Sequence, residues 1–422
     1  MARSVIVIAG KDPTLIDGGS ESYLRAYGRA AVSIGYEPHH FCVSDRSDVE
    51  ATEYGIVHRL RSPFRPFRGL MVAFHQRFVV DGVDRFVADG AEPQLLHSFG
   101  PWPGVGVAAA KRLNKRGVKT VTLSTPFGTY RHETLGKLRG LGPEQPLSTR
   151  LRLWWELAWT RALVDGSERR GYLDSQQVLP NYDSVRQIIA AQMGPGVRFG
   201  KITYCSEGAF REQGTEPGAP PDALAALEPR TAPLVVSVSR HDPRKGLDVL
   251  LHALAELHRR GVRFRACLVG GGVLLEPHRR LAERLGLAGS TAIVGRVPDA
   301  YAFLAHADVF ALPSLEEGSG SVALLEAMQA GAAPVVSRLD GLPEDVTDGE
   351  SALLVEPGDP QALAEALAKL CTDVALRRQI AQGAHASYRA RFSAAAFAAD
   401  LRSVYTRFGF PPAEAEGRSK VI

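Results

Sequence analysis

Residues 312–331, LPSLEEGSGSVALLEAMQAG, combine features that could bind a diphosphate and a sugar. The apolar run 308–312 predicts a strand, Gly318 and Gly320 then break the chain, and residues 321–330 predict a helix. Such a helix start has unpaired N–H groups and the positive end of the helix dipole, which suit a diphosphate. Glu326 lies among apolar residues and could accept two ribose hydroxyls; the alternative is an ordinary glutamate on the exposed helix face.

This stretch resembles the signature of the retaining family 4 glycosyltransferases of GT-B fold, in which two glutamates flank a Gly-rich loop and hold a nucleotide sugar. The resemblance implies that Glu326 binds the ribose and that Glu317 acts near the donor sugar. It also implies donor contacts from the loop and helix start, namely Gly318, Ser319, Gly320 and Ser321. Two features depart from the family: eight residues separate the glutamates, one more than usual, and Ser319 replaces a bulky residue. We therefore expect a longer loop here.

Two cations follow another predicted strand, which ends at Ser239. The resemblance implies that Arg240 and Lys245 hold the diphosphate at the carboxyl ends of the strands, where open α/β sheets bind ligands. Fixed cations there would stabilise the charge that grows on a departing phosphate, without a metal. Without the resemblance, both would be solvated loop charges. Further donor contacts are expected, by resemblance, at Gly270, Gly271, Arg296 and Val297; plain tight turns explain the glycines nearly as well.

The first half of the chain matches the family only in outline. Val5 to Ala9 predicts a buried strand, and Gly18 and Gly19 precede a predicted helix at 21–34; in the family such a loop faces the donor or the acceptor. Many relatives have a histidine after the strand equivalent to 121–123, where this chain has Ser124. His97 and His132 are the other candidates for contacts with the sugar or acceptor, although a lone histidine is more often structural.

The order of these elements predicts two α/β domains, each a doubly wound parallel sheet as in Rossmann-like folds, facing a central cleft in the GT-B manner. We expect an N-terminal acceptor-side domain at 1–212, a Pro- and Gly-rich linker at 213–232 and a nucleotide-sugar-binding domain at 233–392. By resemblance, a last helix at about 393–409 packs back on the first domain. Residues 410–422 form a loose tail.

Composition indicates a soluble globular protein. By resemblance, we expect no cofactor besides the nucleotide-sugar donor substrate. Residues 1–212 carry 28 Lys and Arg against 21 Asp and Glu, a net +7, and the remainder carries 22 against 25, a net −3. A basic first half suits an anionic partner such as a phospholipid surface or a phosphorylated acceptor, whereas nucleic-acid motifs are absent. The four cysteines lack metal or redox spacing and read as reduced thiols. Abundant Ala, Arg, Gly and Pro are typical of a GC-rich bacterial gene.

Two segments combine arginines with aromatic residues and could dock on anionic lipid. Residues 59–86 interleave arginines with phenylalanines, and 150–161 read RLRLWWELAWTR, with Trp154, Trp155 and Trp159. The preferred interpretation places the aromatic rings in the core and the arginines in water. The start, MARSVIVIAGKD, predicts a first strand and not a signal peptide, and no apolar run could span a membrane. We expect a cytoplasmic protein, with a peripheral position at the inner face of the membrane as the alternative.

The sequence therefore predicts, by resemblance, a retaining, metal-independent glycosyltransferase of the hexosyltransferase type. It would move a sugar from a nucleoside diphosphate, with a UDP-sugar as the preferred donor, to a hydroxyl on a glycolipid, polysaccharide or secondary metabolite. Two alternatives remain open, and the altered glutamate spacing and the missing histidine motivate the second of them. One is another GT-B enzyme, such as a sugar phosphorylase or a pseudo-glycosyltransferase, and the other is a non-catalytic protein that binds nucleotide sugars.

Overall fold

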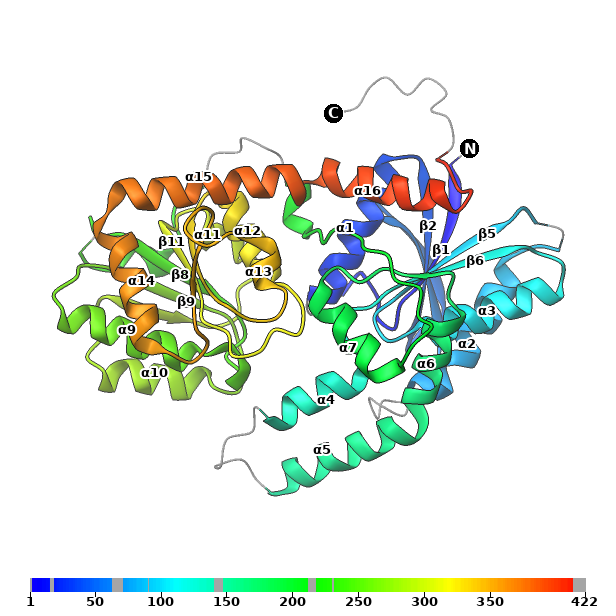
Figure 1. Ribbon diagram of the computed structural model, residues 1–422, viewed down its shortest axis with the longest axis horizontal. Helices are drawn as coiled ribbons and strands as arrows, with labels where there is room; N and C mark the ends of the chain where they lie inside the picture. The colour runs from blue at the N-terminus through cyan, green and yellow to red at the C-terminus, as the bar shows by residue number, and fades with distance from the viewer. Residues whose placement is uncertain are drawn as a thin grey trace. The chain divides into compact units, whose positions relative to one another are not determined.

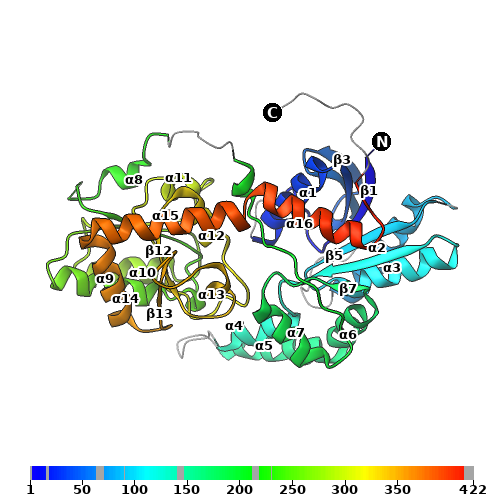
Figure 2. The same ribbon diagram turned by 45° about the horizontal axis from the view of Figure 1, so that its top comes forward.

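The chain forms two compact units, each built on one sheet (Figures 1 and 2). The computed structural model describes residues 2–15, 19–62, 71–89, 91–139, 147–211, 218–229 and 231–412. Within these residues, unit 1 comprises the chain before residue 140 together with 147–210 and 394–412, and unit 2 comprises 211–393. The predicted linker at 213–232 lies partly outside the described residues, and its described part contains the short helix α8 (Asp222–Ala225). Most of the predicted loose tail, residues 413–422, also lies outside them.

Unit 1 contains a seven-stranded sheet in the order β3-β4-β2-β1-β5-β6-β7. The strands are β1 (Arg3–Ile8), β2 (Tyr36–Ser44), β3 (Asp48–Thr52), β4 (Gly55–Arg61), β5 (Gln94–Phe99), β6 (Thr120–Thr125) and β7 (Gln177–Val178). All neighbours are parallel, as predicted, except β3 and β4, an antiparallel edge pair that the sequence analysis did not identify. The tight turn that joins them, ending at Gly55 with φ 120°, can connect only antiparallel strands.

The central strand β1 is apolar and fully buried over residues 5–8, so both faces of the sheet there must be covered by helices. One face is covered by α2 (Met71–Phe86) and α3 (Pro103–Lys115), and the other by α1 (Gly19–Ser33), on which the last helix α16 (Ala394–Arg407) packs (Figure 1). The remaining helices of the unit are α4 (Tyr130–Arg139), α5 (Leu147–Trp159), the π-helical turn η1 (Thr160–Val164), α6 (Asp165–Asp174), α7 (Asp183–Met193) and the 3-10 turn η2 (Glu207–Phe210).

Unit 2 contains a six-stranded, wholly parallel sheet in the order β10-β9-β8-β11-β12-β13. Its strands are β8 (Leu234–Val238), β9 (Arg265–Val269), β10 (Thr291–Val294), β11 (Val309–Leu312), β12 (Ala333–Ser337) and β13 (Leu353–Val355). Its other helices are η3 (Pro243–Lys245), α9 (Leu247–Arg259), α10 (Leu275–Arg284), α11 (Tyr301–Leu304), α12 (Val322–Ala330), α13 (Leu342–Asp345), α14 (Pro360–Thr372) and α15 (Val374–Arg391).

The core of unit 2 shows why its helical patterns were readable from the sequence. Five leucines of α9 follow the helical repeat and are buried on one face against the sheet and α14, namely Leu247, Leu250, Leu251, Leu254 and Leu257.

Two further features of the chain bear on the predictions from the sequence. All four cysteines are free and buried, and no helix among the described residues is long and apolar enough to cross a membrane.

Candidate active site

The predicted cations and the predicted glycine loop of unit 2 meet at one point of its sheet. Strands β8 and β11 are neighbours, and the chain continues from β8 to β9 on one side and from β11 to β12 on the other. This is a topological switch point, and in open α/β sheets ligands bind outside the carboxyl ends of the strands at such points. Arg240 follows the end of β8, and the loop 313–321 follows the end of β11.

The loop after β8 holds its two cations differently. The Arg240 side chain is 69% exposed, and its ion pair with Asp242 is long at 3.7 Å. Asp242 instead caps the turn η3, where its side chain accepts a hydrogen bond from the Arg244 N–H. Lys245 ends that turn, and its Nζ donates to Glu317 Oε2 at 2.7 Å. One exposed cation and one cation held by a carboxylate therefore lie at this strand end.

Gly246 explains how the chain can bring Lys245 to Glu317. It has a left-handed backbone, φ 58°, and a Cβ built on it would lie 2.1 Å from the carbonyl oxygen of Pro313. The N–H groups of Leu315 and Glu316 then donate to the carbonyl of Arg244. Only glycine permits this close approach of the two loops, so Gly246 is a requirement of the site that the sequence analysis did not identify.

Glu317 is held on both carboxylate oxygens. Oε2 accepts from Lys245, Oε1 accepts from Ser314 Oγ at 2.5 Å, and the side chain is only 6% exposed. The Glu317 and Gly318 N–H groups both donate to Asp340 Oδ2, at 2.8 Å each. Asp340, with φ 49°, fixes the longer loop in this way, a role that the sequence did not suggest. The carboxylates of Glu317 and Asp340 thus make their hydrogen bonds to other groups of the protein. No group of metal-binding side chains occurs in the described parts of the chain.

The glycine loop leads into α12 as predicted. Gly318 has φ 78°, Ser319 O accepts from the Gly341 N–H, and Gly320 and the extended Ser321 precede the first helical residue, Val322. Glu326 lies in the second turn, where it is half-buried. Burial raises the pKa of the nearby Tyr301, the Arg211 cation lowers it, and the Glu326 carboxylate raises it further. The Glu326 carboxylate is therefore close enough to Tyr301 to act on its hydroxyl electrostatically.

The loops after β9 and β10 supply the other predicted donor contacts. Gly270 and Gly272 have φ near 150°, and a Cβ at either would lie within 2.3 Å of the carbonyl oxygens of Ser239 or His241. Both glycines are therefore needed for the close packing of these loops, independently of any contact with a ligand. Gly271 lies beside Arg296, which is exposed, and Val297 is half-buried.

His241 is a buried residue of the site region that the sequence analysis did not single out. Its Nδ1 lies 2.8 Å from Nδ1 of His278 on α10, and burial lowers its pKa to about 4. A neutral histidine pair therefore supports the loop that carries Arg240. The signal available in the sequence was its position directly after Arg240.

The candidates in unit 1 differ in accessibility. Gly18 lies outside the described residues, and Gly19 begins α1. His97 is fully buried in β5; its ring nitrogens contact Tyr405 Oη and Thr125 Oγ1 at 2.8 Å, and burial lowers its pKa to about 3. Ser124 is buried in β6 and bonds Ser175. Both side chains are therefore occupied within the fold, which argues against a contact with sugar or acceptor.

His132 is the remaining histidine candidate and is half-buried at the start of α4. Its backbone N–H donates to Thr129 Oγ1, and its Nε2 has no hydrogen-bond partner among the described residues. Among His97, Ser124 and His132, only His132 therefore has a side-chain polar atom without a hydrogen-bond partner in the described part of the chain.

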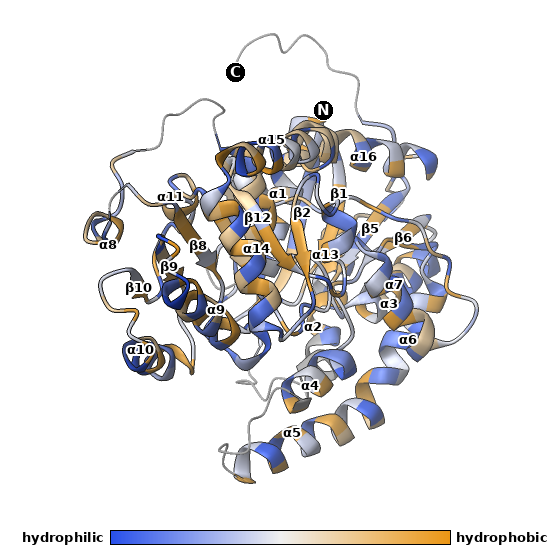
Figure 3. Ribbon diagram, turned by 60° about the vertical axis from the view of Figure 1, so that its left-hand side comes forward, coloured by the Kyte–Doolittle hydropathy of each residue, from blue (hydrophilic) through white to orange (hydrophobic). Residues whose placement is uncertain are grey.

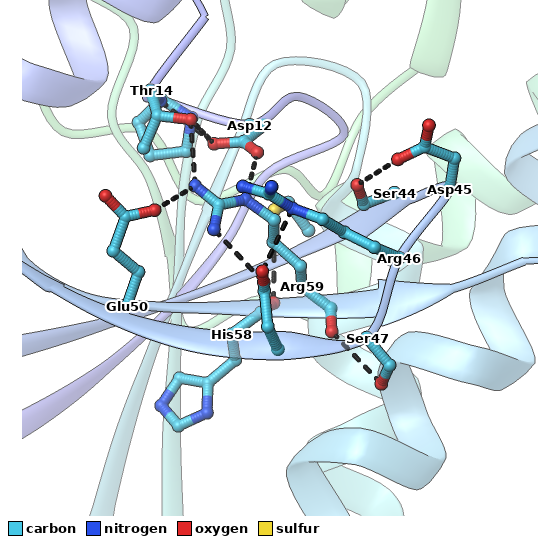
Figure 4. Close-up of polar contacts among 12 residues, drawn as sticks. Asp12, Thr14, Ser44, Asp45, Arg46, Ser47, Glu50, His58 and Arg59 are labelled. Carbon is cyan, nitrogen blue, oxygen red and sulfur yellow. Dashed lines mark hydrogen bonds and ion pairs between the residues drawn. The ribbon is translucent and has the colours of Figure 1, made fainter.

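Before α1, the loop after β1 is fixed by a buried cation (Figure 4). Arg59 on β4 contacts Asp12 and donates to Thr14 Oγ1 at 2.9 Å, and it also pairs with Asp48 and Glu50 on β3. Arg59 was predicted to lie in water, and this is wrong: its side chain is 1% exposed because antiparallel β3 brings two of these carboxylates over it. Burial works to raise the pKa of Asp12, but hydrogen bonds from Arg59 and Thr14 outweigh it and hold the pKa below its usual value.

Part of unit 2 is similar to a known protein family. Residues 225–386 match the family described as Glycosyl transferases group 1. This segment contains the unit 2 residues discussed above except Arg211. A phosphatidylinositol monomannoside mannosyltransferase of Mycolicibacterium smegmatis, described as GDP-mannose-dependent, is 38% identical over 39% of this chain and 45% of its own length. A D-inositol 3-phosphate glycosyltransferase of Corynebacterium efficiens is 37% identical over 42% and 43%. The chain thus spans about half the length of the curated relatives it matches.

Solved structures show the fold of the whole chain. Sucrose-phosphate synthase from Thermosynechococcus elongatus superposes with a TM-score of 0.71 at 23% identity, over 96% of this chain and 99% of the other. The Anabaena protein HepE in complex with UDP-glucose does so with a TM-score of 0.65 at 18% identity, over 95% and 99%. The segment from residue 225 to residue 386 therefore belongs to the glycosyl transferases group 1 family, and the chain that carries it has the GT-B fold.

Proposed function

We propose that this protein is a retaining glycosyltransferase that moves a sugar from a nucleoside diphosphate to a hydroxyl acceptor without a metal. The observation that carries the proposal is the convergence of Arg240, Lys245 and the start of α12 at the switch point of unit 2. Two cations and a helix N-terminus together offer a diphosphate several donors from one side. The proposal is supported by the family match of this segment.

The chemistry requires stabilisation of a leaving group. The bond between the sugar's anomeric carbon and the diphosphate oxygen breaks, and negative charge grows on the phosphate. Lys245, held by Glu317, is already oriented, whereas Arg240 is free to move onto the phosphate. Preorganised positive charge of this kind is most valuable where charge develops in the transition state. Glu326 would fix the ribose from α12.

Retention follows most simply if the acceptor attacks the face from which the diphosphate leaves. The acceptor oxygen bonds to the anomeric carbon, its proton passes to the departing phosphate oxygen, and no covalent enzyme intermediate forms. Glu317 is a poor candidate for a nucleophile because both of its oxygens are occupied by Lys245 and Ser314. The protein's part is therefore to position the donor and to stabilise the charge on its phosphate.

For substrates, we propose a UDP-sugar donor and an acceptor that carries phosphate. The donor proposal is supported by the HepE complex with UDP-glucose, and the GDP-mannose-dependent relative makes GDP-mannose the necessary comparison. The acceptor proposal is supported by the net +7 of residues 1–212 and by relatives named for inositol 3-phosphate and a phosphatidylinositol mannoside.

The test is a matrix of donors and acceptors. UDP-glucose, UDP-galactose and GDP-mannose are each incubated with inositol 3-phosphate, phosphatidylinositol and unphosphorylated inositol, and nucleoside diphosphate release is measured. We expect release that depends on a phosphorylated acceptor, with an α-linked product by NMR from an α-linked donor. Release of sugar 1-phosphate that requires inorganic phosphate would identify a phosphorylase instead. Tight donor binding without turnover on any acceptor would identify a binding protein.

A further inference from the structure

Helix α5 has two apolar faces, and only one of them is buried. Leu153 and Leu157 pack into unit 1, where α5 contacts mainly α4 and η1. The opposite stripe is open to solvent, with exposed fractions of 70% for Leu147, 60% for Leu151, 59% for Trp154 and 58% for Trp155. These positions recur at the helical repeat, i, i+4, i+7 and i+8, so they share one face. The stripe continues into η1 with Leu163, which is 47% exposed.

The exposed stripe contradicts the preferred interpretation of Trp154 and Trp155 as core residues, whereas Trp159 is half-buried. Trp155 stacks on Trp159, with ring centroids 5.6 Å apart and an interplanar angle of 15°. Large apolar side chains gathered on one helix face are uncommon on a protein surface without a partner. Indole rings favour the boundary between water and hydrocarbon because the ring is apolar and its N–H is polar.

Charge indicates which partner fits. Arg152 and Arg161 are exposed beside the stripe, Arg150 is half-buried on the same helix, and Glu156 is the one acidic residue of α5. A helix with an apolar face, interfacial tryptophans and flanking arginines is suited to lie in the plane of an anionic membrane surface. A protein that bound this face would need an apolar groove surrounded by acidic residues. The features of α5 do not require a partner of that shape.

The place of α5 within unit 1 leaves room for a flat partner. In Figures 1 and 3, α5 lies at the edge of its unit, joined through η1 to α6, and no helix or strand among the described residues of unit 1 lies against its outer side. The hydropathy colouring of Figure 3 shows orange and blue segments alternating along α5, as two apolar faces separated by charged residues require.

We infer that α5 is a membrane-docking helix that binds anionic lipid through Leu151, Trp154 and Trp155, with Arg152 and Arg161 contacting lipid phosphates. This inference names the surface and partner that would bring the proposed enzyme to a lipid acceptor, but lipid binding itself does not require the proposed activity. Docking here is peripheral, since α5 is too short to cross a bilayer.

The test is flotation of the full-length chain with vesicles of phosphatidylcholine alone or with about 30% phosphatidylglycerol. We expect binding to the anionic vesicles that weakens with salt. The double variant W154S/W155S should bind at least about tenfold more weakly, because it removes the interfacial indoles. R152E/R161E should lose the preference for anionic lipid. Matched controls are V273S, at a residue 76% exposed in unit 2, and R280E/R284E on α10, which should bind like the wild type.

Each other outcome overturns the inference. Wild-type protein that does not float with anionic vesicles, or that floats equally with both lipids, has no such surface. Equal loss in the α5 variants and the α10 control would indicate a general charge effect. If sedimentation shows a dimer that W154S/W155S converts to a monomer, the stripe belongs to a second copy of the chain. Circular dichroism of each variant verifies folding, and turnover on a water-soluble acceptor tests the proposed function separately.

Discussion

Both units place an arginine or lysine near a carboxylate at or beside the carboxyl ends of their strands, yet the two arrangements serve different ends. In unit 1, Arg59 is 1% exposed and is surrounded by Asp12, Asp48 and Glu50. In unit 2, Lys245 has one carboxylate partner, Glu317, and Arg240 is 69% exposed. A cation whose donors are all used within the protein can hold a loop but cannot bind an incoming anion. The number of donors left open, and not the presence of a cation, separates a ligand site from a structural one.

The largest expected effect tests the structural side of this comparison. Arg59→Met should lower the free energy of unfolding by about 3–5 kcal/mol, because it leaves Asp12 buried without its counter-charge. Urea unfolding measures the change. The matched control is Arg46→Met, which removes a solvent-exposed pair with Asp48 and should cost less than about 1 kcal/mol. Equal effects for both variants would mean that burial does not distinguish the two arginines.

The next effect tests the ligand side. Lys245→Ala should lower kcat about 10²–10³-fold and change KM much less, because charge on the departing phosphate is greater in the transition state than in the ground state. Arg240→Ala should act in the same direction. Steady-state kinetics with saturating acceptor measures both, with Arg259→Ala on the exposed side of α9 as control. A raised KM with an unchanged kcat would show that these cations only bind.

A third prediction concerns the ribose. Glu326→Ala should weaken binding of the nucleoside diphosphate by about 2 kcal/mol, because it removes charge-assisted hydrogen bonds. Isothermal titration calorimetry measures this without any acceptor. Asp359→Ala, which removes the cap of α14 in the same unit, is a control for changes in stability alone. An unaltered affinity in folded Glu326→Ala protein would remove Glu326 from the site.

The pH dependence of stability should trace in part to unit 1. Burial, with help from Asp165, raises the pKa of Glu168 from 4.5 to about 8. Between these values the folded state keeps a proton that the unfolded state has lost, so this residue makes stability fall as pH rises from 4.5 to 8. The slope from one proton is at most about 1.4 kcal/mol per pH unit. Glu168→Gln should remove that contribution in denaturant titrations across this range; an unchanged slope would contradict the shifted pKa.

The smallest expected effect concerns metal. If Arg240, Lys245 and the start of α12 supply the positive charge, a chelator should leave the rate within about twofold, or about 0.4 kcal/mol in the barrier. Rates in EDTA and in added magnesium measure this. Activity that disappears in chelator and returns with magnesium would contradict the electrostatic account of leaving-group departure.

The sequence was most informative where one periodic pattern determined one element. The leucines of α9 and the apolar run of β11 fixed those elements, and the glycines with Glu326 placed the donor loop and its helix. What the sequence could not show depended on contacts between distant segments. Asp340 became a partner of the Glu317 loop only through folding, and Arg59 was buried by the antiparallel strand β3. His97 looked available for catalysis until Tyr405, more than 300 residues later, filled its hydrogen bond.

That bond between His97 and Tyr405 has a consequence for synthesis on the ribosome. The Tyr405 hydroxyl contacts both Tyr27 and His97 at the centre of unit 1, and α16 covers α1. Unit 1 therefore lacks part of its core until residues 394–407 have emerged, whereas residues 218–393 of unit 2 are complete earlier. Domains usually fold in the order in which they are made. Here we expect the later-made unit to mature first, and the earlier-made unit to wait, with its unfinished core exposed, for the last helix.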